Sequence, residues 1–366
     1  MRKCQAFRRR GSVRVAASRR VSRPVIAALT GGTRGARVRG TWVSGLLLAI
    51  AATALGLYVL WQAASFSAPS TPQGTRVDGD GFPKVLIDQT GRRVVLPRKP
   101  TRIVSVTLAT DEILLALVEP SRLVGVTYLA DDERVSNMTR EAAAIPHKVR
   151  ADPEQIISLQ PDLVFVGSFL RSEFIRLLQA AGLVLFQFQE YDSIAEIQQN
   201  IRLIGRVVGE EARADALVAT MQARLHALAE RLRPVGDRPR VLYWGSQGYT
   251  AGRLTSMDDL ITYAGGENLA ATYGIIGPAN ISAEQVLAMN PQVIVSGSLE
   301  DAQRGLPPAL IHPALRGTDA VRQGRVYTVP SRYLVTISQF IVDGAEAFAR
   351  VLHGTAGTAL GPGGQL

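Results

Sequence analysis

The chain has 366 residues, a single cysteine at Cys4 and a formal net charge of +10. Residues 1–40 hold 12 of the 41 lysines and arginines and no acid, so the remaining 29 bases face 31 acids and give that part a net charge of −2. A near-neutral body excludes the broad basic surface of a nucleic-acid-binding protein, and the length leaves room for two domains without disulfides.

Residues 1–41 are a basic arm, and residues 42–64 are 23 positions without a charge. A run of that length can cross a bilayer as a helix, and Trp42, Tyr58 and Trp61 lie towards its ends, where aromatic rings favour the interface. The positive flank predicts a cytoplasmic arm, an uncleaved anchor and a body on the periplasmic side of the cytoplasmic membrane. A cleaved signal segment, with secretion into the periplasm, is the alternative.

Residues 65–84 are rich in Ser, Pro, Gly and Asp and are interpreted as a flexible tether. Residues 85–209 are predicted to form an N-terminal lobe. It opens with a hairpin over 85–97 and continues with strands that alternate with helices, the first helix capped by Thr110. Such alternation predicts a parallel sheet covered on both faces. The predicted strands span residues 102–107, 122–127, 162–168 and 183–188.

Residues 210–233 are predicted to form one long helix that links two lobes. Apolar residues recur there at steps of three and four, which is one face of an α-helix. At 1.5 Å per residue the helix would be roughly 35 Å long. The alternative is a single α/β domain in which this helix is an ordinary one. The stripe consists of Ala214, Leu217, Val218, Met221, Leu225, Leu228 and Leu232.

Residues 239–353 are predicted to form a C-terminal lobe of similar α/β character, with strands over 240–246, 292–298 and 325–330 and a last helix over 337–353. Residues 354–366 are interpreted as a disordered tail. An internal repeat favours two lobes over one domain. Residues 152–168 and 282–298 are identical at five of 17 positions at a constant offset of 130. Each copy predicts a capped short helix, a proline that ends it and a buried strand.

Glu154 and Glu284 occupy matching places in this repeat, in the first turn of each short helix. A carboxylate there is favoured by the helix dipole alone. The functional alternative is a pair of acidic knobs, one on each lobe, for a partner with basic sockets.

The sequence contains no HExxH, CxxC or GxSxG motif, and its four histidines are scattered, so we expect neither an enzyme nor a bound cofactor. The acidic run from Asp131 to Glu133 is interpreted as a solvated loop. A cation site that also uses His147 is the alternative.

In α/β lobes, ligands bind beyond the carboxyl ends of the parallel strands. Aromatic and arginine side chains follow those ends here, and such a set suits a flat or anionic ligand. Thr107, Phe169 and Tyr249 also lie at strand ends. The residues predicted to contact the ligand are Tyr128, Ser168, Arg171, Trp244, Arg253, Arg332 and Tyr333.

Four stretches together make the chain resemble the class III substrate-binding proteins of ABC importers, the cobalamin and ferric-siderophore type. They read EQIISLQPDLV, TDEILLALVEPSRLVGVT, AGRLTSMDDLITYAGGENLA and HPALRGTDAVRQGRVYTVP, and the similarity covers about residues 85–353. The resemblance implies two Rossmann-like α/β lobes joined by one long helix. It also implies that Glu154 and Glu284 dock into arginine pockets of the membrane permease. Cobalamin binders carry an aromatic residue shortly before each glutamate, and this chain does not.

The expected function is therefore an extracytoplasmic protein, monomeric and held at the membrane by its N-terminal helix. It would capture a metal chelate (a ferric siderophore, haem or a corrinoid) and deliver it to an ABC importer. A single connecting helix predicts a small closure of the lobes on binding. The alternatives are the ligand-binding part of a membrane-anchored sensor and an enzyme on a similar two-lobed fold.

Overall fold

The computed structural model describes residues 76–87, 92–188, 193–234, 236, 238–297 and 312–354. The predicted arm, the anchor over 42–64 and the tail beyond residue 354 lie outside these residues. Among the helices within the described ranges, none combines the length and the apolar character that a membrane crossing requires.

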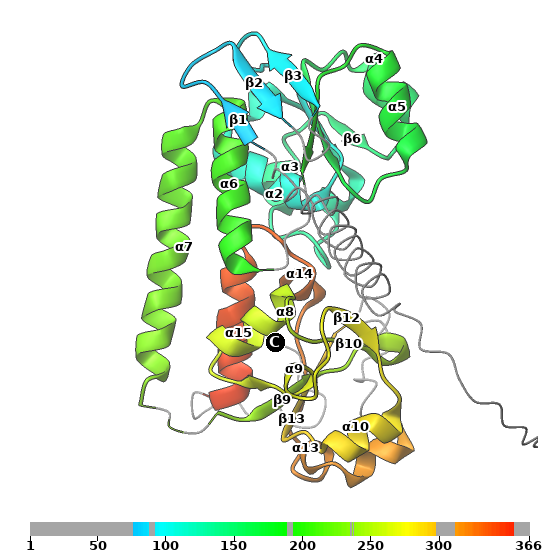
Figure 1. Ribbon diagram of the computed structural model, residues 1–366, viewed down its shortest axis with the longest axis vertical. Helices are drawn as coiled ribbons and strands as arrows, with labels where there is room; N and C mark the ends of the chain where they lie inside the picture. The colour runs from blue at the N-terminus through cyan, green and yellow to red at the C-terminus, as the bar shows by residue number, and fades with distance from the viewer. Residues whose placement is uncertain are drawn as a thin grey trace, which may run out of the picture. The chain divides into compact units, whose positions relative to one another are not determined.

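The N-terminal lobe contains a five-stranded parallel sheet in the order β6-β5-β4-β7-β8, so the predicted parallel sheet is confirmed. Ile103 of the central strand lies between Leu123 and Leu163, and β7 is buried along its whole length, as expected for a sheet covered on both faces. Figure 1 shows this sheet with its helices at the top of the view. The strands are β4 (Ile103–Ser105), β5 (Leu123–Thr127), β6 (His147–Val149), β7 (Leu163–Gly167) and β8 (Leu185–Phe188).

A second, antiparallel sheet of this lobe consists of β1 (Arg76–Asp78), β2 (Lys84–Ile87) and β3 (Arg93–Leu96), which confirms the predicted hairpin. The predicted tether over 65–84 is too long at its C-terminal end, because Arg76 pairs with Ile87. Buried side chains fix this segment: Val77 is 2% exposed and Lys84 only 1%. The Lys84 ammonium donates to the carbonyl of Arg206 and to the carboxylate of Glu211.

Three of the five described helices of the N-terminal lobe begin where a side-chain cap satisfies free backbone N–H groups. Thr107 caps α2, so the predicted cap at Thr110 is wrong by one turn. The Thr110 side chain is instead buried and lies 2.6 Å from the Ser105 hydroxyl. Ser193 caps α6. The helices are α2 (Leu108–Leu117), α3 (Thr139–Ala142), α4 (Pro153–Ser158), α5 (Ser172–Ala180) and α6 (Ile194–Val208), with 3₁₀ turns at η1 (Pro120–Arg122) and η2 (Tyr128–Asp131).

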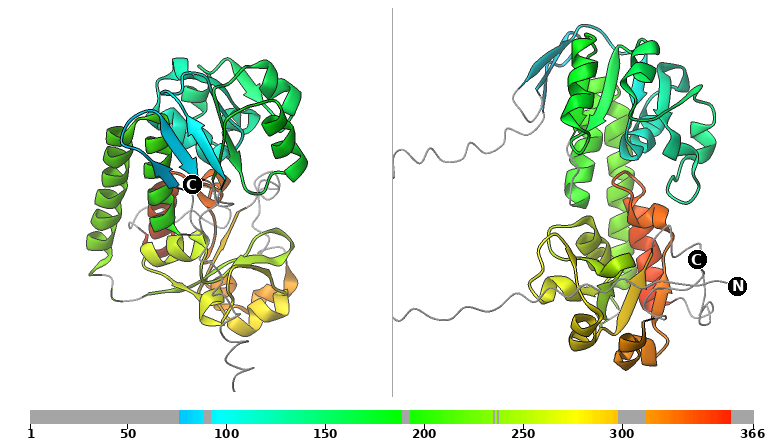
Figure 2. Two further views of the ribbon diagram at one scale, coloured as in Figure 1. Left: turned by 45° about the horizontal axis from the view of Figure 1, so that its top comes forward. Right: turned by 90° about the vertical axis from the view of Figure 1, so that its right-hand side faces the viewer.

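The predicted linker helix is α7 (Glu211–Leu232), and its buried residues belong to the predicted stripe. Its N-terminus is tied to the N-terminal lobe, because Glu210 forms ion pairs with Lys99 (2.8 Å) and Arg122 (2.6 Å). Its middle is tied to the C-terminal lobe, because Arg224 pairs with Asp343 and Glu346 at 3.0 Å each. Figure 2 shows α7 from two further sides.

The C-terminal lobe contains a four-stranded parallel sheet in the order β11-β9-β13-β14 and a two-stranded ribbon of β10 and β12. The strands are β9 (Arg240–Tyr243), β10 (Tyr249–Ala251), β11 (Glu267–Asn268), β12 (Pro278–Asn280), β13 (Val293–Ser296) and β14 (Val326–Thr328). The helical segments are η3 (Ser246–Gly248), α8 (Ser256–Tyr263), α9 (Leu269–Thr272), α10 (Ala283–Met289), η4 (Pro313–Gly317), α13 (Asp319–Arg322), α14 (Ser331–Leu334) and α15 (Ile341–His353). The last helix was predicted from residue 337, four residues too early.

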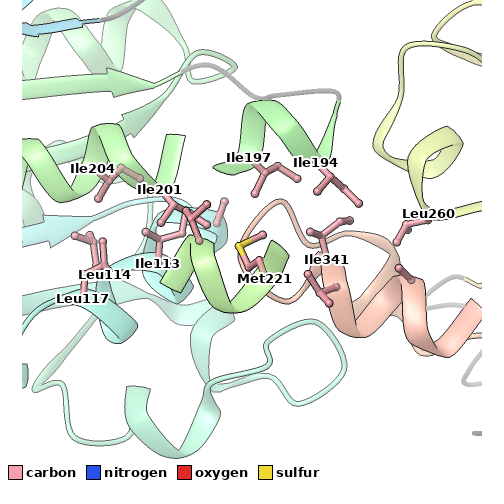
Figure 3. Close-up of a cluster of buried hydrophobic side chains, with 14 of the residues drawn as sticks. Ile113, Leu114, Leu117, Ile194, Ile197, Ile201, Ile204, Met221, Leu260 and Ile341 are labelled. Carbon is pink, nitrogen blue, oxygen red and sulfur yellow. The ribbon is translucent and has the colours of Figure 1, made fainter. Parts of the chain in front are cut away.

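One hydrophobic core runs through the linker region and joins the two lobes. Figure 3 shows Ile197 of α6, Met221 of α7 and Ile341 of α15 in the same cluster of side chains, with Leu260 of α8 beyond them. The carboxylate of Asp259 on α8 also accepts a hydrogen bond of 2.6 Å from the backbone N–H of Ile194, which starts α6. The linker helix is therefore packed against both lobes along its length.

Candidate functional site

Tyr128 and Arg150 lie at the carboxyl ends of two neighbouring strands, β5 and β6. The Arg150 guanidinium stacks over the Tyr128 ring, with its central carbon 3.9 Å from the ring centroid. Tyr128 is 44% exposed, so the stacked pair is open to solvent. A cation held on an aromatic face can contact an anionic, flat ligand.

Arg150 was missed as a candidate by sequence reasoning. The strand that precedes it, β6, has only three residues and reads His-Lys-Val, which is too short and too polar to predict a strand. Its pairing with β5, in which Gly125 lies opposite His147, makes it part of the sheet. The strand-end rule that selected Tyr128 would have selected Arg150 if this strand had been recognised.

Ser168 and Arg171 lie at the end of β7, which β4 separates from β5 in the sheet. Both side chains are exposed, and Arg171 is the residue that precedes α5. Phe169, between them, is 59% exposed, and its ring folds back over Gly167. A Cβ at residue 167 would lie 2.4 Å from that ring, so glycine is required for this close approach. These residues are exposed on the other side of the sheet centre from Tyr128.

Arg332 and Tyr333 follow β14 in the C-terminal lobe and form a second stacked pair, with the guanidinium carbon 5.0 Å from the ring centroid. Arg332 also reaches the N-terminal lobe. Its guanidinium donates to the carbonyl of Glu133 (3.3 Å), and its own carbonyl accepts from the Asn137 side chain (3.1 Å). Since Glu133 follows the 3₁₀ turn that begins at Tyr128, both stacked pairs are connected to one short segment of the N-terminal lobe.

Trp244 contradicts the prediction that it contacts the ligand, because it is 5% exposed and belongs to a hydrophobic core cluster. Side chains alternate between the two faces of a strand, so Trp244 shares the face of Leu242. That face packs against Val286 of α10, whereas Val241 and Tyr243 face the core that runs through both lobes. The strand-end position was identified correctly, but its side chain points into the lobe.

Arg253 is exposed but lies apart from Arg332. It lines a hollow of about 480 Å³ together with Arg238, Asp258 and Glu267. This hollow is next to β11, at one edge of the four-stranded sheet, and Arg332 follows β14, at the opposite edge. The structure therefore does not bring these two predicted ligand residues together.

Glu154 is exposed in the first turn of α4, as the sequence predicts. The Asp152 carboxylate caps this helix by accepting from the backbone N–H of Glu154 (3.0 Å) and of Gln155 (3.4 Å). The Gln155 side chain then joins the helix to the end of β6, because it donates to the Lys148 carbonyl (3.1 Å) and accepts from the Arg150 N–H (3.0 Å). The helix that presents Glu154 is thus held against the sheet.

Glu284 has the matching place in α10, and it is also exposed. A complete capping box begins this helix: the Ser282 hydroxyl accepts from the Gln285 N–H, and the Gln285 side chain accepts from the Ser282 N–H (2.8 Å). Hydrogen bonding to Ser282 lowers the pKa of Glu284 below its ordinary value. Within the described ranges, neither Glu154 nor Glu284 forms an ion pair, so both carboxylates are available to a partner.

Two acids of the acidic run form ion pairs with bases of their own lobe. Asp131 pairs with Lys148 (3.1 Å), and Asp132 pairs with Arg134 (2.6 Å). The pKa of Asp132 is lowered by these hydrogen bonds from Arg134. In the part of the chain that the structure describes, no three His, Cys, Asp or Glu side chains gather where they could hold a metal ion.

Comparison with known proteins finds one matching family model, described as periplasmic binding protein, over residues 103–333. A cobalamin-binding protein of Halobacterium salinarum is 29% identical over 328 residues, covering 87% of this chain and 86% of its own length. Among solved structures, the periplasmic heme-binding protein RhuT of a Roseiflexus species is 28% identical with a TM-score of 0.57, covering 69% of this chain and 98% of its own. The molybdate-binding protein MolA of Haemophilus influenzae shares the fold at 22% identity, with a TM-score of 0.61 and coverage of 73% and 90%.

Proposed function

We propose, from the premise that this chain belongs to the periplasmic binding protein family, that it captures an anionic metal chelate outside the cytoplasm and delivers it to an ABC importer. The observation that carries the ligand class is the pair of arginine–tyrosine stacks, Arg150 on Tyr128 and Arg332 on Tyr333, one on each lobe. Two cations supported by aromatic rings favour a ligand that is both negatively charged and partly flat.

Haem, a ferric siderophore and a corrinoid are the chelates that fit this class. The named relatives support it, since one binds cobalamin and another binds haem. The ligand contacts that we propose are Tyr128, Arg150, Ser168 and Arg171 from the N-terminal lobe, and Arg332 and Tyr333 from the C-terminal lobe. In this proposal the protein binds and releases its ligand unchanged, and it catalyses no reaction.

Delivery is assigned to Glu154 and Glu284. Each is an exposed carboxylate on a helix whose first turn is fixed by side-chain hydrogen bonds, and each lobe supplies one. Charge-assisted pairs with permease arginines would be short and strong. A carboxylate on a rigid helix loses little conformational entropy on docking, which favours these two residues over acids on loops.

We further propose that residues 42–64 anchor the protein in the membrane as a monomer on the periplasmic side. The family supports the extracytoplasmic location, and the charge asymmetry around this run supports the anchor. A reporter enzyme that is active only in the periplasm should work when it is fused after Gly81 and fail when it is fused after Arg39. Retention of the full-length chain in washed membranes selects the anchor over a cleaved signal segment.

The ligand class is tested by titrating the purified full chain with haemin, cyanocobalamin, a ferric hydroxamate siderophore and sodium molybdate. At least one chelate should bind and raise the unfolding temperature, and the gain should grow with chelate concentration. If only molybdate bound, the proposed ligand would be a simple oxyanion and not a chelate. The absence of any thermal shift and any binding across the three chelates would remove the proposed class.

A further inference from the structure

A buried carboxylate of the N-terminal lobe is bonded to the C-terminal lobe. Glu112 of α2 is 1% exposed, and its Oε2 atom accepts from the hydroxyls of Thr336 (2.9 Å) and Ser338 (2.5 Å). These two residues lie between α14 and α15, and both are buried themselves, at 3% and 0% exposed. The carboxylate therefore bridges segments that are 224 and 226 positions apart in the sequence.

The other oxygen of Glu112 is occupied from its own lobe. Oε1 accepts from the backbone N–H of Asn137 (2.8 Å) and from the Asn137 side-chain amide (3.0 Å). The same amide donates to the Arg332 carbonyl, and the Gln339 amide donates to the backbone carbonyl of Glu112 (2.9 Å). Residues 331–339, which we call the strap, are thus held to the N-terminal lobe at Arg332, Thr336, Ser338 and Gln339.

Glu112 also explains why α15 begins later than its apolar pattern predicts. Thr336 and Ser338 direct their hydroxyls to the carboxylate, and the Ser338 hydroxyl in turn accepts from the backbone N–H of Phe340 (3.3 Å). Side-chain bonds of this kind compete with the helical backbone ladder, so the helix starts only at Ile341.

Asp111, the residue before Glu112, provides a matched comparison. It is 0% exposed, and its Oδ2 atom accepts from the backbone N–H (3.1 Å) and the hydroxyl (2.5 Å) of Thr127, which is in the same lobe. The two carboxylates are neighbours with equal burial, and both have donors. The hydroxyl donors of Glu112 come from the strap of the other lobe, whereas the hydroxyl donor of Asp111 comes from its own lobe.

We propose that Glu112 is a positioning residue for ligand binding, which fixes the strap to the N-terminal lobe and so sets the place of Arg332 and Tyr333. Burying a carboxylate costs free energy unless donors surround it, so the strap is held where those donors reach it. The importance of this placement for the ligand rests on the proposed function, in which Arg332 and Tyr333 are ligand contacts.

The test uses the full chain in detergent with Glu112→Gln, Thr336→Val and the control Asp111→Asn. Glu112→Gln keeps the shape but removes the charge, and Thr336→Val removes a donor from the strap side. Asp111→Asn replaces a buried carboxyl group whose bonds stay within one lobe. Spin labels on the exposed positions Arg176 and Ala288, in a Cys4→Ser background, report the distance between the lobes. Haemin titration by absorbance reports affinity, and urea unfolding reports stability.

Glu112→Gln and Thr336→Val should each broaden the inter-lobe distance distribution, and each should weaken haemin binding by roughly tenfold, or about 1.4 kcal/mol. Asp111→Asn should leave both quantities at the wild-type values, whatever its effect on the urea midpoint. The double variant Glu112→Gln/Thr336→Val should be no weaker than the worse single variant, because both remove one bond.

Wild-type distance distributions in both strap variants would overturn the bridging role of Glu112. Broadened distributions with unchanged haemin affinity would overturn its role in ligand placement. A wild-type chain that binds no haemin counts against haem in the proposed function, and the distance measurement still decides whether Glu112 fixes the strap.

Discussion

The two lobes have the same kind of sheet but use its carboxyl edge differently. In the N-terminal lobe, the side chains after β5, β6 and β7 are exposed: Tyr128, Arg150 and Phe169. In the C-terminal lobe, Trp244 after β9 is buried, and so is Gly297 after β13. The stacked pair of that lobe, Arg332 and Tyr333, is half-buried and comes instead from the strap after β14.

This difference teaches that a position at a strand end is not a sufficient sign of a ligand contact. The side chain must also leave the sheet, and the chain can achieve this by turning directly after the strand. η2 begins at Tyr128, immediately after β5. The chain after β9 instead continues the ladder for one more residue, since the Trp244 N–H donates to the Val295 carbonyl (2.9 Å). The pleat of the strand, and not a turn, therefore sets the direction of the Trp244 side chain.

The largest expected effect tests a feature that the two lobes share. Changing both Glu154 and Glu284 to Ala should remove two charge-assisted contacts worth about 1.5–3 kcal/mol each, so uptake through the importer should fall by well over a hundredfold. Chelate affinity in solution should stay at the wild-type value. Uptake in whole cells and binding to the purified protein measure the two quantities.

Glu173→Ala is the control for the double change, because Glu173 is another exposed acid in the first turn of a helix, α5. It removes a favourable charge at a helix N-terminus without touching the proposed docking residues. Uptake that falls as far in this variant as in the double variant would show a general loss of charge or stability. Normal uptake in the double variant would remove the docking role.

The next effect separates the two strand-end aromatics. Trp244→Ala should lower the unfolding free energy by about 3–5 kcal/mol, because it empties part of a core cluster, and should change chelate affinity little in the remaining folded protein. Tyr128→Ala should weaken chelate binding and change the unfolding free energy little, because the ring is 44% exposed and supports Arg150. Urea unfolding and chelate titration of both variants measure this. Equal losses of affinity would place Trp244 in the ligand site after all.

A smaller effect compares the stacked arginines across the lobes. Arg150→Ala and Arg332→Ala should each weaken chelate binding by about 1.5–3 kcal/mol if each meets a charged group. Arg253→Ala is the matched control, because this exposed arginine lines a hollow at the far edge of the sheet. If Arg253→Ala weakened chelate binding while Arg150→Ala and Arg332→Ala did not, the ligand site would have to be that hollow.

Periodicity and local chemistry were sufficient to predict the linker helix, the parallel strands and the repeated module with its two glutamates. They were insufficient for β6, whose three residues become a strand only through pairing with β5. They also could not predict the face of the sheet on which the Trp244 side chain lies, because that face depends on where the strand stops. Strand ends identify an edge of a sheet, and side-chain direction requires the exact register.

The contact between Glu112 and the strap was still harder to predict from the sequence. From its pattern alone, a helix that reads Asp-Glu-Ile-Leu-Leu is expected to have solvated acids. No local feature of the sequence indicates a hydroxyl donor 224 positions away. Thr336 and Ser338 likewise lie just before an apolar helical pattern, which suggested a longer final helix. Long-range pairing of this kind is a property of the folded chain and has no local signature.

The smallest effect uses a last difference between the lobes. The described N-terminal lobe buries Asp111 and Glu112, whereas the buried polar side chains described in the C-terminal lobe are uncharged. Burial raises the pKa of Asp111 from 3.8 to about 7, and burial also raises the pKa of Glu112. Between about pH 4 and pH 7 the folded chain therefore holds a proton at Asp111 that the unfolded chain has released.

Because the folded state binds more protons in that window, the contribution of Asp111 to stability is largest near pH 4 and is lost as the pH rises through about 7. One proton corresponds to at most about 1.4 kcal/mol per pH unit. Asp111→Asn does not titrate, so its unfolding free energy should rise relative to wild type between pH 4 and pH 7, as measured by urea unfolding at four pH values. Asp132→Asn is the control of opposite sign, since hydrogen bonds from Arg134 lower the pKa of Asp132 and its contribution is lost as the pH falls. A constant difference between wild type and Asp111→Asn across the window would mean that Asp111 does not titrate there. Burial of Asp111 would then have no part in the pH dependence of stability.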